Sequence, residues 1–295
     1  MARHSRVLMA VDLSPMDERL MKALYCYYRF LHVHKAYFLH VMPSFSIPKG
    51  ADIEFHSLFT TEYPVDEKVH DKISSDLKEV FGEEPPFETH IDVREVSPLN
   101  KLLHWIKVKE IDWLVVGHKK SSDGSGINGR RVARQSNSNV FFVPDASLRS
   151  TKKILIPIDF SENSARAIRQ AYSWKFLEPD VQIECIYIID LPPSDYYLRP
   201  VPRSGFQAVL RKSAEQAYER FIKKYELGHI PMDMTYQENT YSNIANHIYD
   251  YIKENEIDLL MMGAQGRTAL NNFIFGSVTE RLVERCMEIP VLVIR

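Results

Sequence analysis

Short apolar runs alternate with longer amphipathic stretches along the whole chain. An apolar run without polar alternation is typical of a parallel strand that is buried on both faces. An apolar stripe that recurs every three to four residues is typical of a surface helix. In the first half these patterns predict strands over residues 6–12, 36–42, 87–93, 113–117 and 140–143, and helices over 15–31, 65–81 and 99–109.

The same pattern starts again near residue 153. Residues 153–161 match residues 6–14 at an offset of 147, which places Asp159 over Asp12 and Ser161 over Ser14. Residues 259–263 repeat the strand at 113–117 with the offset lower by one. Two copies of one structural unit are the simplest account, and 295 residues are enough for two domains. The predicted domains are 1–146 and 151–295.

Within each copy, strands alternate with helices. This order predicts an α/β fold of two tandem doubly wound domains, each with a five-stranded parallel sheet covered on both faces by helices. In such sheets, ligands bind beyond the carboxyl ends of the strands, where the winding direction reverses. Asp159, at the end of the first strand of the second copy, and Gly263, at the end of its fourth, are both expected at that end.

A glycine-rich loop in the second copy is the main candidate for chemistry. Gly263, Gly266 and Gly276, followed by Ser277, lie between an apolar run at 257–262 and a helical pattern at 278–286, and the last strand is predicted at 291–294. Glycine lets backbone approach an anion closely or adopt positive φ, and a helix N-terminus favours negative charge. We therefore expect the loop to hold the phosphates of a nucleotide. Arg267 and Thr268 stand in the same loop and can add charge-assisted contacts.

A second interpretation of these residues is structural. The glycines can serve turns and helix ends, and Asp159 and Ser161 can cap a helix. For Asp159 the ligand and capping roles both stay open, whereas Ser161 is expected to be a cap, as is Ser14 in the first copy.

Composition narrows the classes of partner. The net charge of −2 gives no bulk attraction to nucleic acid or to an anionic membrane, and no apolar run reaches the length of a membrane span. The three cysteines, Cys26, Cys185 and Cys286, are isolated, which fits a reducing cytoplasm and argues against a thiolate metal site. We expect a cytoplasmic protein with no nucleic-acid or membrane partner and no protein-bound metal.

Taken together, the chain resembles a tandem two-domain member of the universal stress protein family, within the wider adenine-nucleotide α-hydrolase-like folds. The second copy carries that family's ATP-binding pattern, G-x2-G-x9-G-[ST], as Gly263, Gly266, Gly276 and Ser277. The resemblance implies the strand order 3-2-1-4-5 and bound ATP. It places Asp159 at the ribose or adenine side, Ile188 against the adenine, and the four motif residues with Val278 around the phosphates. It also implies that the last strands pair between two domains, here as an intramolecular pseudo-dimer, and further homodimerisation is left open.

The first copy departs from this pattern. Lys120 stands where Gly266 stands in the second copy, so we expect a lost or altered nucleotide loop there, with Lys119, Lys120, Arg130 and Arg131 as an alternative anion site. The letters Gly124-x-Gly126-x-x-Gly129 match a dinucleotide fingerprint, but they follow the fourth strand and not the first, so the match is taken as chance.

The sequence supports three functional hypotheses. The first is an ATP-binding stress or regulatory protein, with Mg²⁺ bridging the phosphates and an unidentified protein partner. The second is a slow ATPase or self-phosphorylating protein, with Ser277 or Thr268 as acceptor. The third is a nucleotide-free scaffold. No catalytic constellation is evident, since the loop lacks the lysine of a phosphate-binding P-loop and no kinase-type base is present. The long loops at 43–64 and 190–205 are candidates for a lid or partner surface.

Overall fold

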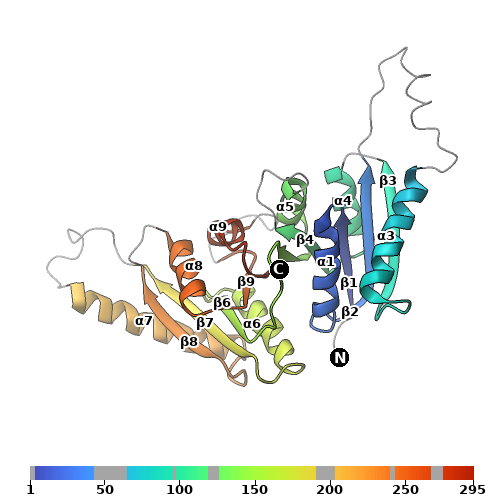
Figure 1. Cartoon of the computed structure of the whole chain (residues 1–295). Helices are drawn as coiled ribbons and strands as arrows, with labels where there is room; N and C mark the ends of the chain where they lie inside the picture. The colour runs from blue at the N-terminus through green and yellow to red at the C-terminus, as the bar shows by residue number, and fades with distance from the viewer. Residues whose placement is uncertain are drawn as a thin grey trace, which may run out of the picture. The chain divides into compact units, whose positions relative to one another are not determined.

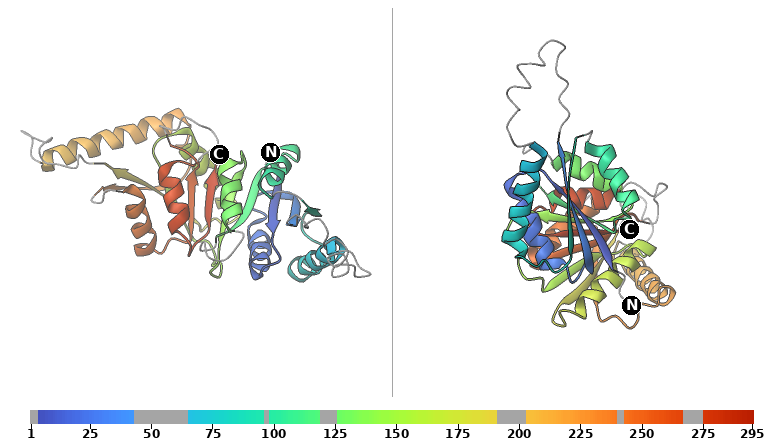
Figure 2. Two further views of the ribbon diagram at one scale, coloured as in Figure 1. Left: turned by 90° about the horizontal axis from the view of Figure 1, so that it is seen from above. Right: turned by 90° about the vertical axis from the view of Figure 1, so that its right-hand side faces the viewer.

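The computed structural model describes residues 4–42, 65–95, 98–118, 126–190, 203–239, 243–266 and 275–295. The chain divides into two compact units, Met1–Asp145 and Ala146–Arg295, drawn in Figures 1 and 2. The division falls in the short segment where the apolar pattern of the sequence starts again.

The first unit is a parallel sheet with helices on both faces. Its described strands lie in the order β3-β2-β1-β4-β5, and every neighbouring pair is parallel. Helices α1 and α3 pack together on one face, and α4 and α5 pack together on the other (Figure 1). The bounds are β1 Ser5–Val11, α1 Pro15–Tyr27, β2 Val33–Met42, α3 Val65–Phe81, β3 Glu88–Glu95, α4 Pro98–Val108, β4 Trp113–His118, α5 Gly126–Gln135 and β5 Asn139–Pro144.

The second unit repeats this architecture. Its described strands lie in the order β10-β9-β6-β7-β8, again all parallel, with α6 packed on β6 and β9 and with α8 packed on α9. The bounds are β6 Lys153–Pro157, α6 Glu162–Lys175, β7 Gln182–Ile189, α7 Arg203–Lys224, β8 Asp233–Glu238, α8 Ile244–Glu254, β9 Leu259–Gly263, α9 Ser277–Arg285 and β10 Val291–Ile294.

Counted along each unit, both sheets have the strand order 3-2-1-4-5. The predicted α/β fold, with its doubly wound parallel sheets, is confirmed. The pairing of the two last strands between the units stays a prediction.

The apolar runs form the centre of each sheet. Leu8 in β1, Leu155 in β6 and Leu260 in β9 are completely buried, and their neighbours along the strands are buried with them. Burial on both faces explains why these strands show no polar alternation. Burying one large apolar side chain contributes about 1.5–3 kcal/mol to the free energy of folding. This burial is therefore the main contribution to the stability of each sheet.

The predicted boundaries between the first helix and the second strand are wrong. Helix α1 ends at Tyr27, four residues before the predicted end at residue 31, and β2 begins at Val33. The chain turns through His32, which has a φ of 52°, and the N–H of Val33 donates to the carbonyl of Tyr28 (2.9 Å). The left-handed residue closes the turns that follow the helix, and the apolar pattern does not record this local bond.

The capping predictions are confirmed. Ser14 precedes Pro15, the first residue of α1, and its side chain accepts the N–H of Met16 (3.3 Å). In the second unit Ser161 accepts the N–H of Ser164 (3.2 Å) at the start of α6. Both units therefore start their first helix in the same way.

Within the described part of the chain, no helix combines the length and the apolar character needed to cross a membrane.

Candidate functional site

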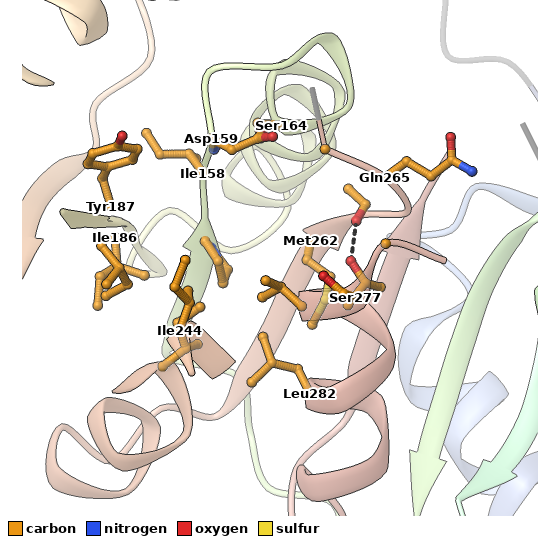
Figure 3. A pocket seen from close by; sticks show the side chains of 18 of the residues that line it. Ile158, Asp159, Ser164, Ile186, Tyr187, Ile244, Met262, Gln265, Ser277 and Leu282 are labelled. Atoms are coloured by element: carbon orange, nitrogen blue, oxygen red, sulfur yellow. Dashed lines mark hydrogen bonds between the residues drawn. The ribbon is translucent and has the colours of Figure 1, made fainter. Parts of the chain in front are cut away.

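A cavity of about 870 Å³ opens in the second unit at the carboxyl ends of β6, β7 and β9. In chain order the winding reverses between β6 and β9, which is where doubly wound sheets place their ligands. The start of α9 completes the wall, and Figure 3 shows the side chains that line the space.

The structure brings seven of the eight predicted site residues to this one cavity. They are Asp159, Ile188, Gly263, Gly266, Gly276, Ser277 and Val278. The eighth, Arg267, lies outside the described residues, as does Thr268.

Helix α9 meets the cavity with its N-terminus. Its N-cap residue is Gly276, which offers no side-chain hydrogen bond, whereas Asn243 caps α8 with its side chain. The N–H of Glu280 donates to the carbonyl of Gly276 (2.9 Å), so the preceding N–H groups of the first turn have no acceptor inside the helix. Because Ser277 and Val278 line the cavity, this end of the helix can receive an anion.

The loop between β9 and α9 is fixed at both ends by hydrogen bonds. The N–H of Gly276 donates to the carbonyl of Ala264 (2.8 Å), and the hydroxyl of Thr279 donates to the carbonyl of Gly263 (3.0 Å). The N–H of Ala264 donates to the carbonyl of Ile294 in β10 (2.7 Å). These bonds hold the start of α9 close to the end of β9.

Gly263 and Gly266 are needed for close packing and not for positive φ. A Cβ on Gly263 would lie 2.7 Å from the Cβ of Asn163 and 3.0 Å from its carbonyl carbon. A Cβ on Gly266 would lie 2.5 Å from Oδ2 of Asp159. Neither glycine has the left-handed backbone that favours glycine. Positive φ, one of the two reasons expected for glycine here, is therefore absent at Gly263 and Gly266, and close approach to an anion stays a prediction.

Asp159 takes part in the turn and in the cavity together. Its Oδ1 accepts the N–H of Ser161 (3.1 Å) and the hydroxyl of Ser164 (2.8 Å). The next residue, Phe160, has a φ of 64°, and its ring stacks on Tyr187 at 4.6 Å between centroids. The carboxylate thus has a structural role and still borders the cavity, so the two interpretations of Asp159 are compatible.

An apolar wall faces the glycine loop. Figure 3 places Ile186, Tyr187 and Ile244 along one side of the cavity, opposite Met262, Ser277 and Leu282. Among the predicted site residues only Ile188 belongs to this wall. Ile244 and Ile248, which α8 supplies to this wall, were not predicted from the sequence. The apolar stripe of that helix was the sequence signal that could have indicated them.

The described lining is acidic. Its charged residues are Asp159 and Asp190, and Oδ1 of Asp190 accepts the side-chain amide of Asn239 (2.8 Å). Neither is part of a metal-binding cluster, because the described residues contain no group of three or more histidines, cysteines or carboxylates that could hold a metal ion.

The corresponding place in the first unit has different chemistry. At the offset of 147, Asp17 replaces Ser164, and Asp17 is only 4% exposed. Its Oδ2 accepts the N–H groups of Leu13 (2.6 Å) and Asp12 (3.2 Å). Burial, with a smaller effect from the neighbouring Asp12 carboxylate, raises the pKa of Asp17 to about 7. An acid in this place opposes an anionic ligand.

The structure describes only part of the segment that follows β4. Lys119 and Lys120 lie outside the described residues, as do the side chains of Gly126–Arg130. Gly126 and Gly129 belong to helix α5. The dinucleotide fingerprint requires glycines in the turn between the first strand and its helix, so the letter match at Gly124 to Gly129 does not form that motif.

Comparison with known proteins gives a family for the second unit. The model of the universal stress protein family matches residues 150–295. The chain is 28% identical over 148 residues to Universal stress protein MJ0531 of Methanocaldococcus jannaschii, covering 49% of this chain and 82% of that protein. It is 25% identical over 160 residues to Universal stress protein MJ0577 of the same organism, covering 49% and 94%.

Solved structures resemble the whole chain in fold. A universal stress protein from Archaeoglobus fulgidus has a TM-score of 0.62 at 17% identity and covers 98% of this chain and 96% of its own. A putative universal stress protein from Pseudomonas aeruginosa has a TM-score of 0.60 at 14% identity, with 99% and 93% covered. The family match at 150–295 and the two sequence relatives agree, and residues 150–295, the second unit, belong to the universal stress protein family.

Proposed function

We propose that the second unit binds ATP in the cavity between β6, β7, β9 and α9, and that the chain is a stress-response or regulatory protein whose interactions depend on the bound nucleotide. The observation that carries the proposal is the N-terminus of α9, whose N-cap residue Gly276 has no side chain to cap it and which borders the cavity through Ser277 and Val278. A helix end of this kind is suited to a phosphate group.

The shape and lining of the cavity support a nucleotide over a simple anion. Its volume of about 870 Å³ lies within the range typical of small-molecule sites. The isoleucines of β7 and α8 supply an apolar wall for a flat base, with Ile188 in the place that the family resemblance gives to adenine. The glycine loop and the start of α9 form the polar end. One apolar end and one donor end match a base and its phosphates.

Charge balance indicates what must accompany the phosphates. The charged residues in the described lining are the acids Asp159 and Asp190, so a polyphosphate needs hydrogen-bond donors and a cation from another source. Backbone N–H groups, the hydroxyl of Ser277 and the side-chain amide of Gln265 are among the donors in the described part of the loop. Mg²⁺ commonly arrives with ATP, bound by the phosphates with few protein ligands. We therefore propose Mg–ATP as the ligand, with no protein cluster dedicated to the metal.

A second candidate function is slow ATP hydrolysis or self-phosphorylation, because the hydroxyl of Ser277 borders the cavity at the proposed phosphate end. Steady release of ADP by the purified protein, lost in Gly263→Asp, would favour this activity over simple binding. Phosphate found on Ser277 by mass spectrometry after incubation with ATP would favour self-phosphorylation.

The test is native mass spectrometry of the purified protein, followed by titration with Mg–ATP. The wild type should retain or bind one adenine nucleotide. Gly266→Lys, which copies Lys120 of the first unit, should lose it because a side chain there meets the carboxylate of Asp159. Gly228→Lys is the control, since Gly228 is exposed and lies outside the cavity lining. A wild type that binds no adenine nucleotide, or a Gly266→Lys variant with unchanged occupancy, would overturn the proposal.

A further inference from the structure

One hydrogen bond joins the first turn of α6 to the glycine loop. The side-chain amide of Asn163 donates from Nδ2 to the carbonyl oxygen of Gln265 (3.0 Å), across 102 positions of sequence. Gln265 and Gly266 line the cavity, whereas Asn163 is not part of the lining. The bond therefore holds the loop from the side that does not face the cavity.

This bond fixes the direction of one peptide group. The carbonyl of Gln265 and the N–H of Gly266 belong to the same planar trans peptide, so they point in opposite directions. With the carbonyl held toward Asn163, the N–H of Gly266 points away from α6. The nitrogen of Gly266 also lies 3.6 Å from the position that a Cβ on Gly276 would occupy. The peptide thus presents its donor on the side where α9 begins.

We propose that Asn163 is a positioning residue for phosphate binding, which orients the N–H of Gly266 so that it converges with the N–H groups at the start of α9. This inference rests on the proposed ATP site. It adds the residue that orients one of the backbone N–H donors of that site. Two donors from separate segments, fixed before the ligand arrives, bind an anion more tightly than donors that must be ordered on binding.

The first unit lacks this device. At the offset of 147, Met16 occupies the place of Asn163, and a methionine has no hydrogen to donate to a carbonyl. Its Cγ would lie 2.9 Å from a Cβ on Gly117, the counterpart of Gly263. The same position therefore only fills space in the first unit, whereas in the second it fills space and holds a peptide in place.

The experiment compares Asn163→Leu with wild type in its affinity for Mg–ATP and for adenosine. Leucine has nearly the same branched shape as asparagine but cannot donate. Asn255→Leu is the matched control, because Asn255 also donates its side-chain amide to a backbone carbonyl, that of Tyr251 (3.0 Å), and is not part of the cavity lining. Affinities come from competition with a fluorescent ATP analogue, and the melting temperature of each ligand-free protein verifies folding.

We expect Asn163→Leu to bind Mg–ATP about tenfold more weakly, the usual size of a lost hydrogen bond near a charged group, and to bind adenosine as the wild type does. Asn255→Leu should bind both ligands as the wild type does. Equal loss of ATP and adenosine affinity in Asn163→Leu, or no loss of either, would overturn the positioning role while leaving the ATP site intact. A wild type that binds no ATP would overturn the site and the inference together.

Discussion

The carboxyl end of β1 in the first unit and that of β6 in the second share one backbone plan and differ in their chemistry. Within two residues of each strand's end comes an aspartate, followed by a residue with φ near 60° and a serine that caps the next helix. The second unit then places Asn163 and Ser164 in the first turn of that helix, where the first unit places Met16 and Asp17. The turn is thus retained in both copies, while the side chains beside the proposed ligand site have diverged.

Asp17 and Ser164 show how this divergence changes the hydrogen bonds and the charge at the end of the first strand. Both accept the backbone N–H of the strand-end aspartate, Asp17 through its carboxylate and Ser164 through its hydroxyl (3.2 Å). The hydroxyl also donates to Oδ1 of Asp159 (2.8 Å), whereas the carboxylate can only repel Asp12 when it is ionised. We interpret the first unit as a copy in which the anion site has been replaced by a buried acid.

The largest expected effect is a pH dependence of the free energy of unfolding that originates from Asp17 in the first unit. The pKa of Asp17 is raised from 3.8 to about 7, so between these values the unfolded chain loses the proton while the folded chain keeps it. The free energy of unfolding therefore falls as the pH rises from about 4 to 7, by on the order of 4 kcal/mol for a shift of this size. Asp17→Ser, which copies Ser164, should remove this fall. The measurement is urea unfolding at a series of pH values.

The reciprocal variant sharpens the same comparison. Ser164→Asp should bring an equivalent fall of stability with rising pH into the second unit, because Ser164 is buried and touches Asp159. Ser173→Asp, on the same helix but outside the cavity lining, is its control. The interpretation fails if wild type and Asp17→Ser show the same pH profile.

A smaller effect is expected from the two strand-end glycines. In Gly263→Ala the new methyl group meets the Cβ and backbone of Asn163, which move only with the helix, so we expect a loss of about 1–3 kcal/mol in the free energy of unfolding. In Gly117→Ala it meets Met16, whose flexible side chain can shift, so the loss should stay below about 1 kcal/mol. Denaturant unfolding measures both. Gly228→Ala, with its nearest atom at 3.7 Å, serves as the neutral reference. Equal losses at Gly263 and Gly117 would contradict this difference between the units.

Much of this organisation could be predicted from the sequence, because it depends on local signals. Unbroken apolar runs indicated the buried strands, and Ser14 with Pro15 indicated the start of α1. The spaced glycines after β9 indicated the loop. The offset of 147 aligned Asp159 with Asp12, and its position after the first strand of the second copy indicated the same end of the sheet. Each of these signals is contained within a few neighbouring residues or in the comparison of the two copies.

The rest depends on contacts that no local pattern records. The bond from Asn163 to Gln265 joins residues 102 positions apart, and the apolar wall combines the end of β7 with one face of α8. Asp17 is visible in the sequence as a difference from Ser164, but its burial and its raised pKa follow only from packing. The early end of α1 depends on the backbone conformation at His32, which periodicity cannot show.

The smallest expected effect concerns the feature that the two units share. Ser14→Ala and Ser161→Ala each remove one side-chain acceptor from a helix N-terminus, so each should lower the free energy of unfolding by about 1 kcal/mol. Because both serines act as caps, Mg–ATP affinity should change by less than about twofold in either variant, well below the tenfold that corresponds to 1.4 kcal/mol. Ser161→Thr keeps the acceptor and should restore the stability. A strong loss of ATP affinity in Ser161→Ala, with stability preserved, would instead make Ser161 a ligand. The two units would then differ in the role of their capping serine as well.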